Sequence, residues 1–211
     1  MSSPMLSKRF RGFLPVIVDV ETGGVDPQHD ALLELAAITI TMDEQGFISP
    51  DQSFHYHIEP SAGMRLDPKA LAFNKIDPGH PFRFAEPEAD VLKNLFEVIK
   101  EDCQRKKCRR AVLVGQNAWF DQQFLNAAAK RHGLTKTHPF HTFTSFDTAT
   151  LSGLVFGQTV LSRALALANI PFNTDDAHSA LYDAQCTALL FCEIVNKFQK
   201  MGGWPLPPLT T

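Results

Sequence analysis

The chain has few cysteines, and their spacing does not fit a metal-binding motif. Only four cysteines occur among 211 residues, and none of them forms the closely spaced pairs of a zinc knuckle. Cys186 and Cys192 fall within a strongly helical stretch, where small buried thiols are common. We therefore expect free thiols and a reducing, cytoplasmic compartment.

Long apolar runs are also lacking. No stretch reaches the roughly 18–20 apolar residues that cross a membrane, and the N-terminal residues have no hydrophobic signal core. The composition is nevertheless 44% hydrophobic over 211 residues, which is enough for one compact domain with a sizeable core. We expect a globular protein without a membrane partner, and we find no internal repeat or linker that would indicate a second domain.

A large excess of one charge is absent too, because the net charge is only −3. This value argues against a protein that coats nucleic acid through charge alone. Positive charge is concentrated in two groups, which comprise Arg105, Lys106, Lys107, Arg109 and Arg110 in the first and Lys8, Arg9 and Arg11 in the second. Such groups can hold phosphates beside an acidic centre, but charge counting fits a solvated surface equally well.

Apolar runs and helix signals alternate in an order that predicts an α/β fold. The first half predicts strands over 13–20, 32–41 and 53–59, and helices that begin with proline at residues 68 and 87. The second half predicts a central strand over 111–115, an edge strand over 142–146, and helices over 119–132, near 147, over 159–169 and over 179–200. We predict a single-domain mixed β-sheet flanked by α-helices. The domain would span 13–200, between a basic segment 1–12 and a Pro/Gly-rich tail 201–211.

Two carboxylates interrupt the first apolar run. Asp19 and Glu21 are two residues apart on the predicted strand, so both side chains point to the same face. Adjacent acids repel each other, and a shared proton or a cation must compensate. Oxygen-only ligands suit hard divalent ions such as Mg²⁺ or Mn²⁺. The pair therefore predicts the floor of a metal-dependent phosphodiesterase site.

Three further candidates follow later in the chain. Asp121 lies in the first turns of the helix after the central strand, and Asp183 lies near the start of the last helix. His178 can approach Asp183 only if it lies in the loop before that helix, which Ser179 as N-cap would permit. Each element alone has a structural alternative: a helix cap, a structural histidine, or an acid pair that discourages edge pairing. The combination, in this order, favours a site.

These residues resemble the DEDDh branch of the 3′–5′ exonucleases. The resemblance rests on Asp19-Val-Glu-Thr-Gly, Asn117-Ala-Trp-Phe-Asp121 and His178-Ser-Ala-Leu-Tyr-Asp183, and these motifs anchor residues 13–200. It implies a ribonuclease H-like fold and a site with two Mg²⁺ ions, or Mn²⁺. Asp19 would bridge the ions, Glu21 and Asp183 would complete one, and Asp121 would hold the other. His178 would be the general base.

Four further segments extend the resemblance to exoribonucleases of that branch. They begin at Asp30, Ala70, Gly157 and Leu190. The resemblance implies a homodimer that trims 3′ ends of structured RNA, including tRNA and rRNA precursors, with the basic groups holding RNA. It also implies base stacking on Phe73, Phe120 and Phe143, whereas Val25 stands where this branch has a phenylalanine.

Two alternative functions stay open beside this prediction. A DNA-polymerase proofreading subunit would need a polymerase-binding segment, and little chain follows Lys200. A catalytically silent nucleic-acid-binding module is disfavoured because all five site residues are present. Activity on DNA 3′ ends also stays open, because little in the sequence selects for a 2′-hydroxyl.

Overall fold

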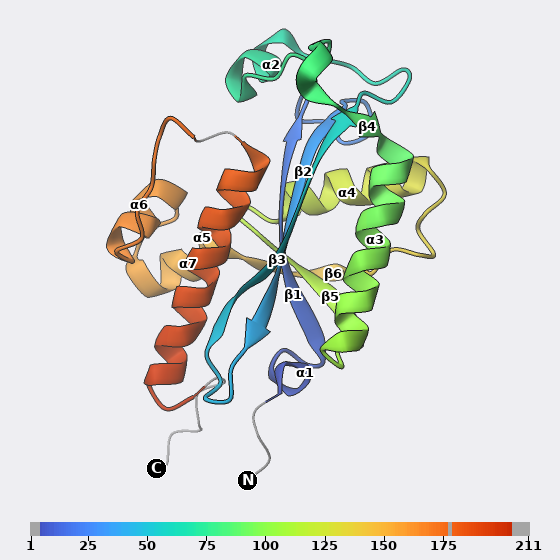
Figure 1. Ribbon diagram of the computed structural model, residues 1–211. Helices are drawn as coiled ribbons and strands as arrows, with labels where there is room; N and C mark the ends of the chain where they lie inside the picture. Colours follow the sequence, from blue (N-terminus) through green and yellow to red (C-terminus); the bar gives the residue numbers. More distant parts are fainter. Residues whose placement is uncertain (1–4, 177–178, 204–211) are drawn as a thin grey trace.

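A six-stranded sheet forms the centre of the computed structural model, which describes residues 5–176 and 179–203. The strand order is β4-β3-β2-β1-β5-β6. β1, β2 and β3 form an antiparallel meander, and β5 and β6 are parallel to β1 and to each other (Figure 1). The strands are β1 Phe13–Thr22, β2 Leu32–Met42, β3 Ile48–Glu59, β4 Glu86–Pro87, β5 Arg110–Gly115 and β6 Phe140–Asp147.

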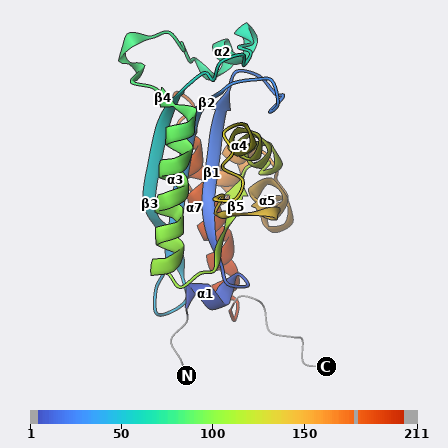
Figure 2. The same cartoon turned by 90° about the vertical axis from the view of Figure 1, so that its right-hand side faces the viewer.

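Helices cover both faces of this sheet. α7 packs along β1, β2 and β3 on one face, with α5 and α6 beside it, whereas α3 and α4 lie on the other face (Figure 1 and Figure 2). The helices are α1 Leu6–Arg9, α2 Pro68–Asn74, α3 Glu88–Arg105, α4 Trp119–Arg131, α5 Thr148–Phe156, α6 Leu161–Leu167 and α7 Ala180–Lys200, with a 3₁₀ turn η1 at Pro81–Arg83. The predicted mixed sheet flanked by helices is confirmed.

The core lies between the sheet and these helices. β1 and β5 are buried on both faces, as their continuous apolar runs require. Leu6 and Phe10, which precede β1, are buried in the same cluster. All four cysteines are buried and free, as expected. Within the described residues no single helix is long and apolar enough to cross a membrane, although α5 and α6 together pass that test as a bent pair.

Most predicted elements occur with small shifts in their ends, and the larger differences have local causes. β3 begins at Ile48 instead of residue 53, because the hairpin with β2 continues to the pair Met42–Ile48. Pro87 ends the short strand β4 and is the N-cap of α3, not its first residue. α6 starts two residues later than predicted, because the Gln158 side chain accepts hydrogen bonds from the amides of Thr159 and Val160.

Candidate active site

Asp19 and Glu21 lie on the same face of β1, near its carboxyl end. In the sheet register Asp19 is opposite Ala36 and Glu21 is opposite Glu34 on β2, and the register shifts directly after Glu21. One carboxylate oxygen from each of the two acids lies within 4.8 Å of the other and of a third oxygen from Asp183. The strand periodicity therefore places both side chains as predicted.

Asp183 reaches this pair from the first turn of α7. The helix begins at Ala180, and Ser179 is its extended N-cap, although the Ser179 side chain makes no capping hydrogen bond. From the fourth position of the helix, the carboxylate of Asp183 completes a three-acid cluster with Asp19 and Glu21. His178, the predicted general base, lies outside the described residues, and its role stays a prediction.

Asp121 approaches β1 from a distant part of the chain, in the first turn of α4. Its Oδ1 accepts a hydrogen bond of 3.1 Å from the Val20 amide, between the two acids of β1. A Cβ on Gly115 would lie 3.0 Å from Asp121 Oδ2 and 3.1 Å from the Ala118 Cα. Glycine at the end of β5 therefore leaves room for this carboxylate, which is buried.

The turn that delivers Asp121 is held by a residue that the sequence analysis did not single out. Asn117 has a left-handed φ of 58°, and the Asp147 carboxylate accepts hydrogen bonds from the Asn117 amide at 2.8 Å and the Ala118 amide at 3.4 Å. The same carboxylate caps α5. Asp147 thus connects two helix starts. An aspartate before a helix signals a cap in sequence, but the second contact spans 30 residues.

Burial and mutual repulsion both raise the pKa values of the acids in this cluster. Burial raises the pKa of Asp19 well above its ordinary value, and the charges of Asp121 and Asp183 raise it further. Burial, Glu34 and Asp183 raise the pKa of Glu21 to about 8. Burial also raises the pKa of Asp121. Without a cation, the group must therefore retain protons near neutral pH. An all-oxygen donor set of this charge fits hard divalent cations such as Mg²⁺ or Mn²⁺.

A pocket of about 1110 Å³ opens above these acids. Its polar wall includes Asn74, Gln116 and Asn117, and its apolar wall is formed by Val25, Leu66, Ala70, Phe73, Trp119 and Phe120. Phe73 is 64% exposed and Val25 is 81% exposed, so both side chains are available to a ligand. The predicted contacts Val25, Phe73 and Phe120 thus line one pocket with Asp19, Glu21, Asp121 and Asp183.

The aromatic predictions need two adjustments. Phe143 is 91% exposed on the edge strand β6, and it does not line this pocket. Trp119, which was not predicted, does line it with 59% of its surface exposed, and its ring meets Phe120 edge-on at 5.8 Å. The sequence signal that could have identified Trp119 is its position two residues before Asp121 in the same motif.

The loop that carries Val25 is braced by a second unpredicted pair. Asp30 Oδ2 accepts a hydrogen bond of 2.9 Å from the Asp26 amide, and Asp30 Oδ1 accepts one of 2.9 Å from Arg65 Nε. A Cβ on Gly24 would collide with the Asp30 carboxylate. The second glycine of the Glu-Thr-Gly-Gly turn is therefore required by this close approach and not by a positive φ.

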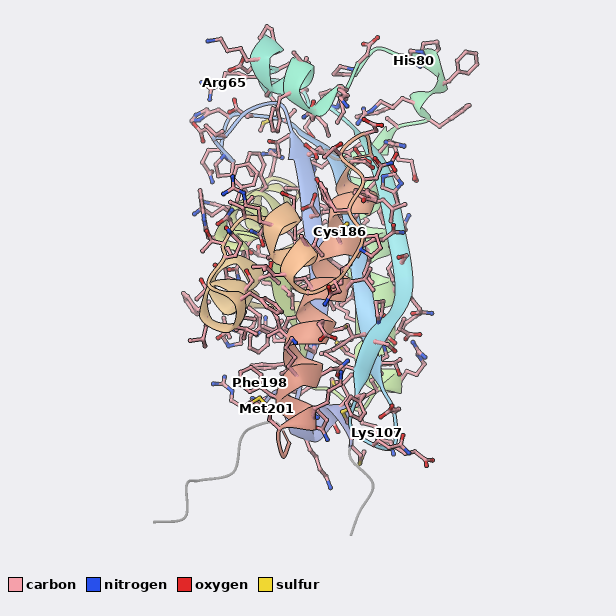
Figure 3. The ribbon with its side chains drawn as sticks, turned by 90° about the vertical axis from the view of Figure 1, so that its left-hand side faces the viewer. Arg65, His80, Lys107, Cys186, Phe198 and Met201 are labelled. Atoms are coloured by element: carbon pink, nitrogen blue, oxygen red, sulfur yellow. The ribbon has the colours of Figure 1, made fainter. Side chains whose placement is uncertain are left out.

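The predicted basic groups lie at the other end of the sheet from the acids. Lys107 marks that end in Figure 3, and Arg65 marks the end with the pocket. The basic residues lie on or directly beside α1, the end of α3 and the start of β5. From Phe13 to Asp19, β1 alone accounts for roughly 20 Å of this separation. The structure therefore does not bring the basic groups and the acids together within one chain.

Several of these cations already have partners within the chain. Lys106 Nζ lies 2.6 Å from Asp102 and 2.7 Å from Asp51, and Arg105 pairs with the same two acids. Arg9 donates to the Gly46 carbonyl at 2.8 Å. The guanidinium groups of Arg11 and Arg109 both lie over the ring of Phe13, at 4.9 and 4.8 Å from its centroid.

Comparison with known proteins identifies the family. The RNase_T exonuclease family model matches residues 16–191. Ribonuclease T of Cronobacter sakazakii is 53% identical over 204 residues, which cover 97% of this chain and 91% of that protein. Ribonuclease T of Salmonella typhimurium is 54% identical over 202 residues, with 96% and 94% covered.

Solved structures show the same fold at low sequence identity. E. coli exonuclease I in complex with a dT13 oligonucleotide has a TM-score of 0.70 at 15% identity, with 90% of this chain and 42% of that chain covered. A 3′-exonuclease solved for recognition of the histone mRNA stem-loop has a TM-score of 0.65 at 16% identity, with 90% and 64% covered. This chain spans less than half the length of exonuclease I. On its ribonuclease H-like fold, the protein belongs to the ribonuclease T family of exonucleases.

Proposed function

We propose that this 3′–5′ exoribonuclease uses two divalent cations, Mg²⁺ or Mn²⁺, to remove nucleotides one at a time from the 3′ ends of structured RNAs. The observation that carries the proposal is the cluster of Asp19, Glu21 and Asp183, with Asp121 against the backbone between the first two. The proposed products are nucleoside 5′-monophosphates. The catalytic domain would be residues 13–200, between the basic segment 1–12 and the tail 201–211.

The four acids would hold the cations. Asp19 would contact both, Glu21 and Asp183 would complete one site, and Asp121 would serve the other. When bound, the cations supply charge stabilisation for the phosphoryl group and the leaving 3′-oxygen. The raised pKa values of Asp19 and Glu21 support this assignment, because a cation relieves the repulsion that otherwise keeps protons on the acids. His178 would remove the proton from the attacking water, a task that suits an imidazole near neutral pH.

The apolar wall of the pocket would hold the terminal bases. Phe73 and Phe120 line the pocket with exposed or half-buried rings, and base stacking on such rings contributes about 1–3 kcal/mol per base. Phe143 would contact a more distant nucleotide. Val25 covers the same pocket with an aliphatic side chain, so the terminal base makes an apolar contact without ring stacking. We expect weaker or altered discrimination between terminal bases, and identical cleavage profiles for this enzyme and Val25→Phe would contradict that.

The proposed substrates are tRNA and rRNA precursors, and DNA 3′ ends are a second candidate. The pocket would take a stacked, unpaired terminus, and its lining offers both apolar and polar side chains to a terminal nucleotide of RNA or DNA. All four free thiols are consistent with work in a reducing compartment, for which we propose the cytoplasm.

We further propose that the protein acts as a homodimer, in which the basic end of one copy holds RNA that is cleaved by the other. The support is the separation of the basic residues from the acids along β1. Arg11, Lys107, Arg109 and Arg110 would be the main phosphate contacts. Arg9, Arg105 and Lys106 would contribute less, because each already binds groups of its own chain.

The test is a cleavage assay on a labelled tRNA with an intact 3′ end, in Mg²⁺ or in EDTA, beside a matched single-stranded DNA. We expect Mg²⁺-dependent loss of a few 3′ nucleotides that stops near the duplex. Asp183→Asn should abolish turnover, whereas Asp90→Asn, in the exposed first turn of α3, should leave it unchanged. Endonucleolytic fragments or cleavage in EDTA would overturn the proposal, and so would near-normal activity of His178→Ala.

A further inference from the structure

A second group of metal-ligand side chains lies beside the acidic cluster, and it has a different chemistry. His55 and His57 are two residues apart on β3, so their rings lie on one face of the strand. In the register with β2, His57 is opposite Glu34 and His55 is opposite Ala36. One ligand atom from each of Glu34, His55 and His57 lies within 4.8 Å of the other two.

These three side chains already face a common point. His55 Nε2 and Glu34 Oε1 form a short hydrogen bond, and the two imidazole rings meet edge-on with centroids 4.7 Å apart. Glu34 is buried and His57 is half-buried, whereas 27% of the His55 side chain is exposed. The trio therefore has a buried carboxylate, two ring nitrogens within 4.8 Å of it, and access from solvent on the side of His55.

The charge around the trio favours a cation. Glu21 is the register partner of Glu34 on its other side, so two carboxylates adjoin one another across β1 and β2. Arg83 brings positive charge to both Glu34 and His57. Its guanidinium is engaged elsewhere, because it donates to the carbonyls of Ile58 at 2.9 Å and of Leu33.

We propose that Glu34, His55 and His57 form a site for a borderline transition-metal ion of the Zn²⁺ class, separate from the Mg²⁺ or Mn²⁺ cluster. Two imidazoles and one carboxylate are a common protein ligand set for such ions, with the next position open to water or a ligand. Mg²⁺ prefers oxygen ligands and does not suit this trio. The two neighbouring clusters therefore differ in their donor atoms. The cluster on β1 and α7 offers only oxygen ligands, whereas the cluster on β2 and β3 offers two imidazoles and one carboxylate.

The site would lie about 5–10 Å from the Glu21 carboxylate, one to two strand spacings across the sheet. An ion there would bind Glu34, the register partner of Glu21 across β1 and β2. This inference does not depend on the proposed RNA substrate, because it concerns residues outside that pocket lining.

The test is titration of the full-length protein with Co²⁺, whose visible absorption reports nitrogen ligands and low coordination number. The background is Asp19→Asn/Asp183→Asn, which removes two acids of the oxygen-only cluster. We expect one tightly bound Co²⁺ per chain, displaced by Zn²⁺ and not by millimolar Mg²⁺. His57→Asn and His55→Asn should each abolish the absorption band. The matched control is His29→Asn, which removes an exposed histidine paired with Asp26 and should keep the band.

A parallel titration of the unmutated chain in saturating Mg²⁺ keeps the proposal testable if the background variant is unstable. Zn²⁺ binding that is lost in His57→Asn and retained in His29→Asn supports the site. If Co²⁺ gives no band in either protein, or if the band survives loss of both β3 histidines, the trio is a hydrogen-bonded structural group and the proposal is wrong. Exonuclease activity that persists with an empty trio would leave the proposed function intact.

Discussion

Replacing Glu21 with glutamine should stabilise the metal-free protein while it weakens cation binding at the site that Glu21 would complete. An unfolded glutamate titrates near pH 4.5, whereas burial, Glu34 and Asp183 raise the pKa of folded Glu21 to about 8. At pH 7 the folded state must therefore keep a proton that the unfolded chain releases. Holding that proton lowers the free energy of unfolding by about 3 kcal/mol. A glutamine at this position carries no such penalty and can still accept the hydrogen bond from Asn74.

The sign of the pH dependence follows from the same shift. Because the folded pKa lies above the unfolded one, the unmutated protein loses this stability as the pH rises from about 4.5 towards 8. The advantage of Glu21→Gln should thus be under about 1 kcal/mol at pH 5 and near 3 kcal/mol at pH 7. For a chain of this size the latter corresponds to a rise in Tm of roughly 6–12 °C.

Urea unfolding in EDTA at pH 5 and pH 7, followed by circular dichroism, measures both values. Addition of Mg²⁺ should then stabilise the unmutated protein more than the variant, since a ligand stabilises a state in proportion to how tightly that state binds it. Equal stability of the two proteins at pH 7, or a difference that does not change with pH, would refute the reasoning. Either result would mean that burial and repulsion of the acids do not destabilise the folded protein when the cations are absent.

Three further predictions concern other buried or exposed groups. Burial lowers the pKa of His138 to about 4, so the folded protein loses stability as the pH drops from 6.5 towards 4 and the unfolded chain takes up the proton. This residue should account for about 2 kcal/mol of the fall in unfolding free energy between pH 7 and pH 5, and urea unfolding of His138→Asn should show that the fall is smaller by this amount. Glu88→Ala should cost about 1–3 kcal/mol, because the buried Glu88 carboxylate accepts hydrogen bonds from Arg131 and Ser61 that alanine cannot accept, whereas Asp90→Ala, in a surface pair, should cost under about 1 kcal/mol in the same assay. In a Trp204→Phe background, an oligonucleotide bound in EDTA should quench the fluorescence of Trp119; unchanged emission on binding would contradict its place in the base pocket.

The parts of the site that follow from local rules were predictable. The period of two on a strand places Asp19 and Glu21 on one face whatever the rest of the fold does, and the structure confirms it. Asp67 and Pro68 begin α2 where an N-cap followed by proline indicates a start. The buried strand 111–115 appears as β5 with one extra residue. In each case the deciding interaction lies within a few residues along the chain.

The parts that depend on distant partners were not predictable from one sequence. Lys106 looks like a free cation in a basic run, but Asp51 from β3 lies 2.7 Å from its amine. Asp147 looks like an ordinary cap of α5, yet it also fixes the turn before Asp121. Trp119 adjoins the site motif, and only the tertiary structure shows its ring exposed in the pocket and not buried. A sequence pattern predicts which face of a strand or helix a side chain lies on, but it does not predict which distant residues that side chain contacts.

The separation of acidic and basic ends also limits how the positive charge can act. The Debye length at physiological ionic strength is about 8 Å, and β1 alone places roughly 20 Å between Phe13 and Asp19. Charges at Lys107 and Arg109 are therefore screened from the cluster of their own chain, and they cannot neutralise its acids or draw a short substrate into the pocket. Under the proposed function they would contribute by direct contact with phosphates. Those phosphates would belong either to RNA that extends along the full sheet or to RNA held for the site of a second copy. In both cases the repulsion among the acids is relieved locally, by retained protons or by a cation bound among them, so metal binding and RNA capture would be separate steps of the proposed reaction.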